Sequence, residues 1–257
     1  MACEGCTTAS KLDFDFSMAF QPIYDADAGR VWGYEALVRG VSGEGAFEVL
    51  SKVSPEQRYR FDQDCRVKAI ELASRLFPAG EDLMLSINFM PKAVYEPAAC
   101  LRATLLTAKR CSFPMSSIMF EFTEHEEVSD TTHLTNIITE YRRHGFTTAV
   151  DDFGAGHAGL GLLVDFQPDL IKIDMKLIRG IDTSPARQAV VAGIVGIAGE
   201  LGIRLLAEGI ETEAEFRVLR AAGIRLFQGY WFAKPAFEAL PQVQLDAVPA
   251  VVERVYE

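Results

Sequence analysis

The polar residues of this sequence that could carry out chemistry lie within or at the ends of short apolar segments. They are Glu35, Asn88, Glu121, Asp151, Asp152, Lys172, Glu208 and Gln228. Carboxylate and amide oxygens held together select Mg²⁺ or Mn²⁺ rather than zinc. The adjacent Asp151 and Asp152 suit a pair of metal ions, because one carboxylate can bridge both ions while the other holds the second. Two ions about 3.5–4 Å apart are a recurring device for in-line displacement at phosphorus.

These apolar segments alternate with helix-like patterns along the chain. After an early apolar segment at 31–38, short strands are predicted at 82–89, 117–124, 146–151, 169–174, 203–208 and 224–229. Helix starts are marked by Ser54-Pro55, Ser184-Pro185 and Thr212, since Ser and Thr are good N-caps and Pro suits the first helical position. Repeated strand–helix units with almost continuously apolar strands indicate a parallel sheet covered by helices.

Six such strands and an N-terminal pair predict an α/β fold of the (β/α)8 TIM-like barrel type. An open, doubly wound sheet is the alternative, and the lack of a GxGxxG motif or P-loop at a helix start disfavours its nucleotide-binding form. The carboxyl ends of the parallel strands of a barrel form one face, and that face carries the active site. The polar residues would therefore meet in one cavity, where bound cations are needed to offset the repulsion between carboxylates.

Each of these residues also has an ordinary structural explanation. A single Asp or Glu at a strand end is most often a helix N-cap or a solvated loop residue. Asp151-Asp152 could lie in a plain turn between strand and helix, and Lys172 could extend its charged end to solvent. Asn88 could merely satisfy backbone groups. Their recurrence in register over six successive strands favours a shared site.

The overall composition excludes several classes of protein. The chain has 257 residues, 49% hydrophobic and 24% charged, which are globular proportions. A net charge of −11 without clustered Lys and Arg argues against binding a nucleic-acid polymer. No run of about 18 uncharged apolar residues predicts a membrane span, and no secretory signal is evident. Five scattered cysteines fit a reducing, cytoplasmic location.

An ordered set of motifs gives a more specific indication. In chain order they are Phe20-Gln21-Pro22-Ile23, Glu35-Ala36-Leu37 with Arg39, Ser86-Ile87-Asn88, Glu121-Phe122-Thr123-Glu124, Asp151-Asp152-Phe153-Gly154-Ala155-Gly156, Lys172-Ile173-Asp174, Ala207-Glu208-Gly209-Ile210-Glu211 and Gln228-Gly229-Tyr230. This set spans about residues 17–235 and resembles the EAL domain, the cyclic di-GMP phosphodiesterase family. The Glu-Ala-Leu triplet alone would carry no weight, whereas the ordered set is a strong signal.

The resemblance implies a barrel with one early antiparallel strand and hydrolysis of one phosphodiester of cyclic di-GMP to linear pGpG. It implies two Mg²⁺ or Mn²⁺ ions per site, with Glu35, Asn88, Glu121, Asp151, Asp152 and Glu208 as metal ligands and Asp151 bridging. Lys172 would orient the attacking water, and Asp152 and Glu208 would share the catalytic role. The implied substrate-binding residues, including those that support the water and metal shell, are Gln21, Leu37, Arg39, Gln228 and Glu211, with Arg39 contacting a phosphate.

The resemblance also implies a homodimer. In the family, the loop at 151–156 links the metal site to a dimer interface, and Glu124, Phe153, Gly154 and Gly156 would belong to this coupling. The sequence departs from the commoner family pattern at His157-Ala158-Gly159-Leu160, where Tyr-Ser-Ser-Leu is usual, and at Phe89-Met90, where Leu-Ser is frequent. Neither departure removes an implied metal ligand, but the first leaves the coupling of this loop open.

Three functions are consistent with these residues. The first is an active phosphodiesterase, inhibited by Ca²⁺ because the larger ion tolerates a coordination that does not suit in-line chemistry. The second is a catalytically silent EAL module that acts as a cyclic di-GMP receptor or a protein-partner module. The third is an unrelated metal-dependent barrel enzyme. Every implied ligand is present, which favours the first.

The expected domain organisation is one EAL barrel at 17–240, a flexible N-terminal leader at 1–16 and a peripheral C-terminal segment at 241–257. Cys3 and Cys6 form a CxxC pair in the leader, but a closed zinc site needs two further ligands. A disordered leader is therefore the expectation. A metal shared between two copies and a redox role are the alternatives.

Overall fold

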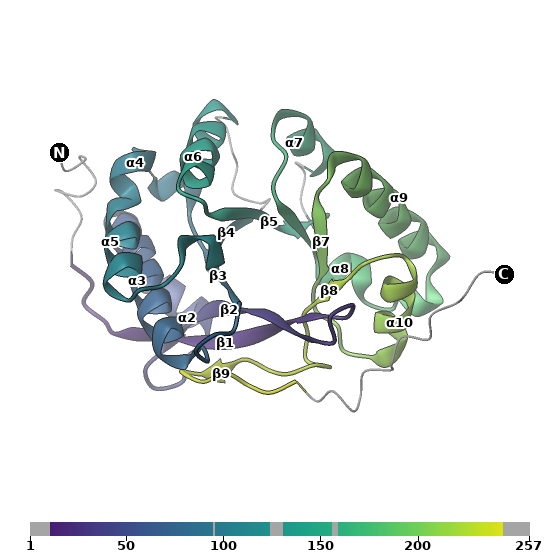
Figure 1. The fold of residues 1–257 in the computed structure, drawn as a ribbon, viewed down its shortest axis with the longest axis horizontal. Helices are drawn as coiled ribbons and strands as arrows, with labels where there is room; N and C mark the ends of the chain where they lie inside the picture. Colours follow the sequence, from purple (N-terminus) through teal and green to yellow (C-terminus); the bar gives the residue numbers. More distant parts are fainter. Residues whose placement is uncertain (1–10, 95, 124–130, 156–158, 244–257) are drawn as a thin grey trace.

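The strands of this computed structural model form a closed eight-stranded barrel, with helices around most of it and β9 on the side of β1 (Figure 1). The structure describes residues 11–94, 96–123, 131–155 and 159–243. Strands β2 to β8 run parallel in chain order, and β1 closes the ring by pairing antiparallel with both β2 and β8. A ninth short strand, β9, pairs antiparallel with another part of β1. The predicted barrel with one early antiparallel strand is therefore confirmed.

The regular elements follow the predicted alternation. The strands are β1 (Phe16–Asp25), β2 (Arg30–Gly40), β3 (Met84–Asn88), β4 (Ile118–Thr123), β5 (Thr147–Phe153), β6 (Leu170–Ile173), β7 (Arg204–Ala207), β8 (Leu226–Phe227) and β9 (Ala236–Phe237). The α-helices are α2 (Ala46–Ser51), α3 (Arg58–Leu76), α4 (Pro97–Cys100), α5 (Arg102–Arg110), α6 (Thr131–Arg143), α7 (Gly159–Asp165), α8 (Met175–Ile178), α9 (Pro185–Leu201) and α10 (Glu213–Ala221). Short 3₁₀ turns lie at η1 (Pro55–Gln57), η2 (Pro91–Ala93), η3 (Met115–Ser117) and η4 (Ile181–Thr183).

The inside of the barrel is apolar toward the amino-terminal ends of the parallel strands. A buried layer there is formed by Ile23, Met119, Ala149, Leu170, Leu206 and Leu226, with Trp32 and Met84 packed against it. Side chains alternate between the two faces of a strand, so the residue two positions later points inward again. These next inward positions include Glu121, Asp151, Lys172 and Glu208. The barrel therefore has an apolar floor and a polar upper half.

The outward-facing strand residues pack against the helices. Leu85, Ile87, Phe120, Phe122, Ile171 and Ile173 are buried members of this outer core. Because both faces of each parallel strand are covered, the strands read as nearly continuous apolar runs in the sequence.

Two helix starts follow the capping residues that the sequence marks, whereas the third, Ser54-Pro55, opens the 3₁₀ turn η1 and α3 begins at Arg58. The Ser184 hydroxyl accepts a hydrogen bond from the Arg187 backbone N–H at the start of α9, and Gly202 ends this helix with φ of +69°. Thr212 and Glu215 form a capping box at the start of α10. In the part of the chain that the structure describes, no helix combines the length and apolar character needed to cross a membrane.

Candidate active site

Lys172 lies at the centre of the polar half of the barrel. Its Nζ lies 2.7 Å from Glu208 Oε1, 3.1 Å from Glu121 Oε2, 3.2 Å from Asp151 Oδ1 and 3.3 Å from Glu35 Oε2. The side chain points inward because Ile171 and Ile173 take the outward positions of β6. It is only 1% exposed, so it does not extend to solvent. One ammonium group thus joins carboxylates carried by β2, β4 and β5 and by the residue after β7.

Asn88 is the last residue of β3 and contacts two of these carboxylates. Its Nδ2 donates to Glu35 Oε1 at 3.0 Å and to Glu121 Oε1 at 2.9 Å. Ser86, two positions earlier on the same face, donates its hydroxyl to Glu121 Oε2 at 2.6 Å. Ser86 was not singled out from the sequence as a site residue, although its spacing from Asn88 places it on the same strand face.

Asp151 and Asp152 both reach the site because β5 is irregular at this point. Adjacent residues of a regular strand point to opposite faces. The β5–β6 pairing shifts register between Val150 and Phe153, and Asp152 has φ of +55°. Bulges next to active sites re-aim side chains in this way, and Asp is one of the few residue types that tolerates a positive φ. As a result, oxygens of Asp151, Asp152 and Glu208 all lie within 4.8 Å of one another.

The inner carboxylates respond to burial and to each other. Burial raises the pKa of Glu121 well above its ordinary value, and the neighbouring Glu35 raises it further. Burial opposes the ionisation of Glu35 as well, yet Lys172 and the surrounding hydrogen bonds hold the pKa of Glu35 below its ordinary value. Burial disfavours the charge of Lys172, but the carboxylates around it raise the pKa of the ammonium well above its ordinary value. Lys172 is therefore a charged donor.

One lysine does not neutralise the whole cluster. Burial and Asp151 raise the pKa of Glu208 well above its ordinary value. Burial, Asp151 and Asp174 raise the pKa of Asp152 to about 6. Further positive charge would let these carboxylates ionise together. The donor set consists of carboxylate and amide oxygens, so the residues present fit Mg²⁺ or Mn²⁺.

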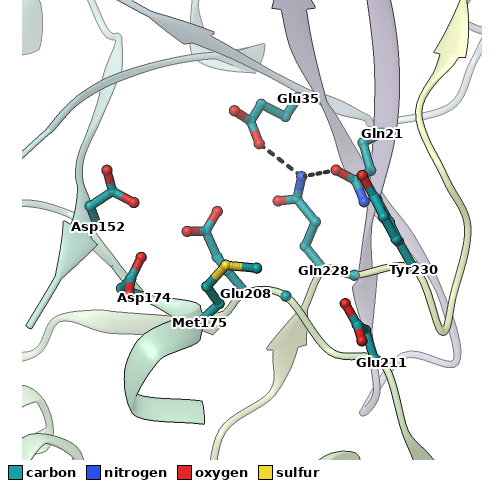
Figure 2. A pocket seen from close by; sticks show the side chains of 11 residues that line it. Gln21, Glu35, Asp152, Asp174, Met175, Glu208, Glu211, Gln228 and Tyr230 are labelled. Atoms are coloured by element: carbon teal, nitrogen blue, oxygen red, sulfur yellow. Dashed lines mark hydrogen bonds between the residues drawn. The ribbon is translucent and has the colours of Figure 1, made fainter. Parts of the chain in front are cut away.

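Two cavities adjoin the cluster and share Glu35. The first has a volume of about 260 Å³, and its lining includes Gln21, Asp152, Glu208, Glu211, Gln228 and Tyr230 (Figure 2). The second has a volume of about 380 Å³, and its lining includes Met18, Leu37, Phe61, Ile87, Asn88 and Asp151. The expected single cavity is thus two adjoining hollows, the first lined by more polar residues and the second lined mostly by apolar residues. Asp174 and Met175 also line the first cavity and were not among the predicted site residues.

Two glutamines form a connected pair in the first cavity. Gln228 Nε2 donates to Gln21 Oε1 at 3.1 Å and to Glu35 Oε2 at 2.8 Å (Figure 2). Gln21 Nε2 donates in turn to the Ala233 carbonyl oxygen at 3.2 Å. The buried Gln228 Oε1 has no hydrogen-bond partner among the described residues, and it points toward Glu208 in Figure 2. Gln228 therefore has an unpaired buried acceptor beside the carboxylates.

The remaining predicted site residues lie further from the cluster. Glu211 lines the first cavity and accepts a hydrogen bond from Arg179 Nη2 at 2.7 Å. Arg39 lies on β2, and its Nη1 donates to the Val38 carbonyl oxygen at 2.7 Å. Leu37 lines the second cavity. The structure thus brings Leu37 and Glu211 to the cavities but shows Arg39 folded back on its own strand.

The loop that follows β5 is described only in part. Phe153 is buried at the end of β5, and Gly154 has φ of +92°. Glu124, Gly156 and His157 lie outside the described residues, as do Cys3 and Cys6.

The site is acidic, is centred on a lysine and lies at the carboxyl ends of the barrel strands. These features place the protein in the class of barrels with a candidate divalent-metal centre. Residues 8–235 match the sequence profile of the EAL domain. The chain therefore belongs to the EAL domain family.

Two curated relatives of this chain have names that describe different functions, an antirepressor and a phosphodiesterase. The chain is 31% identical over 240 residues to the blue light- and temperature-regulated antirepressor BluF of Escherichia coli K12, covering 93% of this chain and 59% of BluF. It is 32% identical over 229 residues to the cyclic di-GMP phosphodiesterase PA2567 of Pseudomonas aeruginosa, covering 86% of this chain and 38% of PA2567. The chain thus spans between about two fifths and three fifths of the length of these relatives.

Solved structures of similar proteins carry ligands. A standalone versatile EAL protein from Vibrio cholerae O395, in its c-di-GMP bound form, superposes with a TM-score of 0.87 at 51% identity, covering 92% of this chain and 99% of that one. Klebsiella pneumoniae BlrP1 superposes with a TM-score of 0.84 at 35% identity in complexes of cy-diGMP with calcium or manganese, covering 89% of this chain and 57% or 58% of BlrP1.

Proposed function

We propose that this protein is a Mg²⁺- or Mn²⁺-dependent phosphodiesterase that hydrolyses one phosphodiester of cyclic di-GMP to linear pGpG. The observation that carries the proposal is the buried Lys172 with four carboxylates within 3.3 Å, beside the cluster of Asp151, Asp152 and Glu208. The relationship to a named cyclic di-GMP phosphodiesterase and the c-di-GMP bound form of the similar Vibrio protein support this substrate.

The metal ligands in this proposal are the oxygen donors that converge on the upper half of the barrel. They are Glu35, Asn88, Glu121, Asp151, Asp152 and Glu208. When bound, two cations would offset negative charge on the phosphate and lower the pKa of a water molecule. The manganese complex of BlrP1 supports this choice of ion.

Lys172 orients and stabilises the attacking water in this proposal. Its raised pKa keeps it an ammonium group, which donates hydrogen bonds and does not accept a proton. Asp152 and Glu208 lie within reach of the same region and accept hydrogen bonds from the water. The free Gln228 Oε1 adds one more acceptor, whose direction is set by the bonds to Gln21 and Glu35. Glu211 supports this water and metal shell from the rim.

The two cavities suit a ligand with an anionic middle and two aromatic ends. The second cavity has apolar walls that include Leu37 and Ile87, which fit the flat face of a guanine base. The first cavity offers Gln21 and Tyr230 beside the carboxylates. Arg39 would turn from the Val38 carbonyl oxygen to reach a phosphate.

The test is incubation of the purified protein with cyclic di-GMP and Mg²⁺ or Mn²⁺, followed by chromatography of the products. We expect pGpG with the unsubstituted protein and none with Asp151→Ala. We expect no turnover in Ca²⁺ alone, and full activity in Ca²⁺ would contradict the inhibition. Ligand binding without product would contradict the proposed enzymatic activity and support the receptor alternative. The similarity to an antirepressor is the reason for considering that alternative.

We also propose that the protein forms a homodimer through α7. Leu160 is 54% exposed and Val164, one turn later, is 80% exposed, so this short helix presents an apolar face. The helix begins a few residues after Asp152, at the end of β5, and Gly154, which follows that strand. Dimerisation would therefore bear directly on the segment that positions a metal ligand.

A further inference from the structure

A buried ion pair lies behind the candidate metal ligands, on the helix side of the barrel wall. Arg66 of α3 is fully buried, and its Nη2 lies 2.7 Å from Asp62 Oδ2 one turn earlier. Arg66 Nη1 donates to the Tyr141 hydroxyl at 2.7 Å. Burying two charges is expensive, and an apolar pair of similar volume often gives equal or higher stability. The pair therefore needs an explanation other than stability.

The contacts of Arg66 lead to the strands that carry two proposed metal ligands. Its guanidinium carbon lies 5.4 Å from the Phe89 ring centroid and 5.1 Å from the Phe120 ring centroid, within cation–π range. Phe89 directly follows Asn88, and Phe120 directly precedes Glu121. Adjacent side chains of a strand point to opposite faces. The rings that Arg66 holds outside the barrel therefore restrict Asn88 and Glu121 inside it.

The contacts of Asp62 fix the backbone at the same place. Asp62 Oδ1 accepts a hydrogen bond from the Met90 N–H at 2.9 Å. The neighbouring Phe89 N–H donates to the Glu121 carbonyl oxygen at 2.9 Å. Two consecutive N–H groups after Asn88 are thus held, one by α3 and one by β4. The chain direction at the end of β3 depends on both bonds.

We propose that Asp62 and Arg66 are positioning residues that hold the end of β3 and thereby aim Asn88 at the metal ion. This inference rests on the proposed function, because it takes Asn88 and Glu121 as metal ligands. Outer residues that orient metal ligands commonly change metal affinity about 10- to 100-fold when they are replaced. The departure from the commoner family pattern at Phe89-Met90 falls on the residues that these contacts use.

The test measures binding of Mn²⁺ alone by electron paramagnetic resonance or calorimetry. The Asp62→Leu/Arg66→Met double variant replaces the ion pair with apolar side chains of similar size. We expect its Mn²⁺ affinity to fall about 10- to 100-fold. The metal-free variant should stay folded with a somewhat lower melting temperature, because the Met90 N–H and the Tyr141 hydroxyl lose their hydrogen-bond partners. The matched control is Arg60→Met/Asp64→Leu, which removes an exposed i,i+4 pair of the same helix at 2.8 Å. This control should leave Mn²⁺ affinity unchanged.

A second variant keeps the inference testable if the double variant does not fold. Asp62→Asn preserves shape but weakens the hold on Arg66 and the Met90 N–H, so Mn²⁺ affinity should again fall. Unchanged affinity in either folded variant would overturn the positioning role, and so would an equal loss in the control. Absence of Mn²⁺ binding by the unsubstituted protein would instead overturn the proposed function, and the positioning role with it.

Discussion

At the scale of single residues, the electrostatics of the site depend on Lys172. It is the one ammonium group in contact with the carboxylates of the cluster among the described residues. We expect Lys172→Met to lower turnover of cyclic di-GMP about 100- to 1,000-fold, because a preorganised donor to the reacting oxygen is lost. Lys176→Met, in the exposed part of α8, is the control and should retain turnover. A Lys172→Met variant with full activity would exclude the role in orienting water.

The same substitution has a second, separate readout. Without the ammonium, the carboxylates lack their internal counter-charge, so the metal-free variant should be less stable than the unsubstituted protein. A bound cation supplies positive charge and stabilises the folded state by mass action. Mn²⁺ should therefore raise the melting temperature of Lys172→Met by more than it raises that of the unsubstituted protein. An equal shift would contradict this account of the site.

Asp152 has a carboxylate in the proposed metal site and a backbone with positive φ, and different substitutions can test these two properties separately. Its φ of +55° suits Asn, whereas a β-branched residue is strained there by about 1–2 kcal/mol. Asp152→Asn should weaken Mn²⁺ binding yet raise the metal-free melting temperature, because repulsion from Asp151 is removed. Asp152→Val should weaken binding and also lower the melting temperature. Calorimetry with and without Mn²⁺ checks both, and equal stabilities for Asn and Val would argue against strain at the bulge.

At the scale of elements, α8 supports the turn that directly follows Asp151 and Asp152 of β5. A Cβ added at Gly154 would lie 2.3 Å from Leu177 Cδ1 of α8, and the φ of +92° disfavours any side chain there. Gly154→Ala should therefore destabilise the protein by about 1 kcal/mol or more and lower Mn²⁺ affinity. Gly161→Ala is the control, since nothing lies within 4 Å of its added Cβ. Chemical denaturation should show the first variant less stable and the second unchanged or more stable.

The sequence predicted the long-range order of the elements better than their local details. The strands of 117–124 and 169–174 were expected because their alternating apolar residues face the helices, and they became β4 and β6. Their inward residues Glu121 and Lys172 followed from the period of two. The short α2, α8 and β9 were not predicted, because a segment of six residues or fewer is too short to show a clear periodicity.

The site required information that no local pattern contains. Asp151 and Asp152 were expected to act together, but regular alternation would separate them, and only the irregular pairing of β5 with β6 brings both inward. The contact of Arg66 with Phe89 and Phe120 joins three separate segments of the chain, so no local spacing signals it. The retracted Arg39 reflects side-chain freedom, which a motif does not record.

At the scale of the whole molecule, the apolar parts of the barrel that stabilise the fold are separate from the charged cluster proposed to carry out the chemistry. The apolar floor around Met119, Leu170 and Leu206 closes one end, and the helices cover the outer faces of the strands. The charged cluster can then occupy the upper half without exposing the outer core to water. A net charge of −11 does not prevent binding of an anionic ligand if cations enter first at this open end.

The proposed homodimer connects this site to the outer surface. Val164 on α7 is 80% exposed, and Leu106 on α5 is 59% exposed on another side of the barrel (Figure 1). A charge placed in an apolar contact is desolvated without a partner, so Val164→Glu should weaken dimerisation by about tenfold or more. Leu106→Glu should leave the assembly unchanged. Sedimentation over a range of concentrations checks this, and turnover should fall with the dimer if α7 helps to position Asp152. A protein that sediments as a monomer at every concentration with full activity would contradict the interface and its coupling to the site.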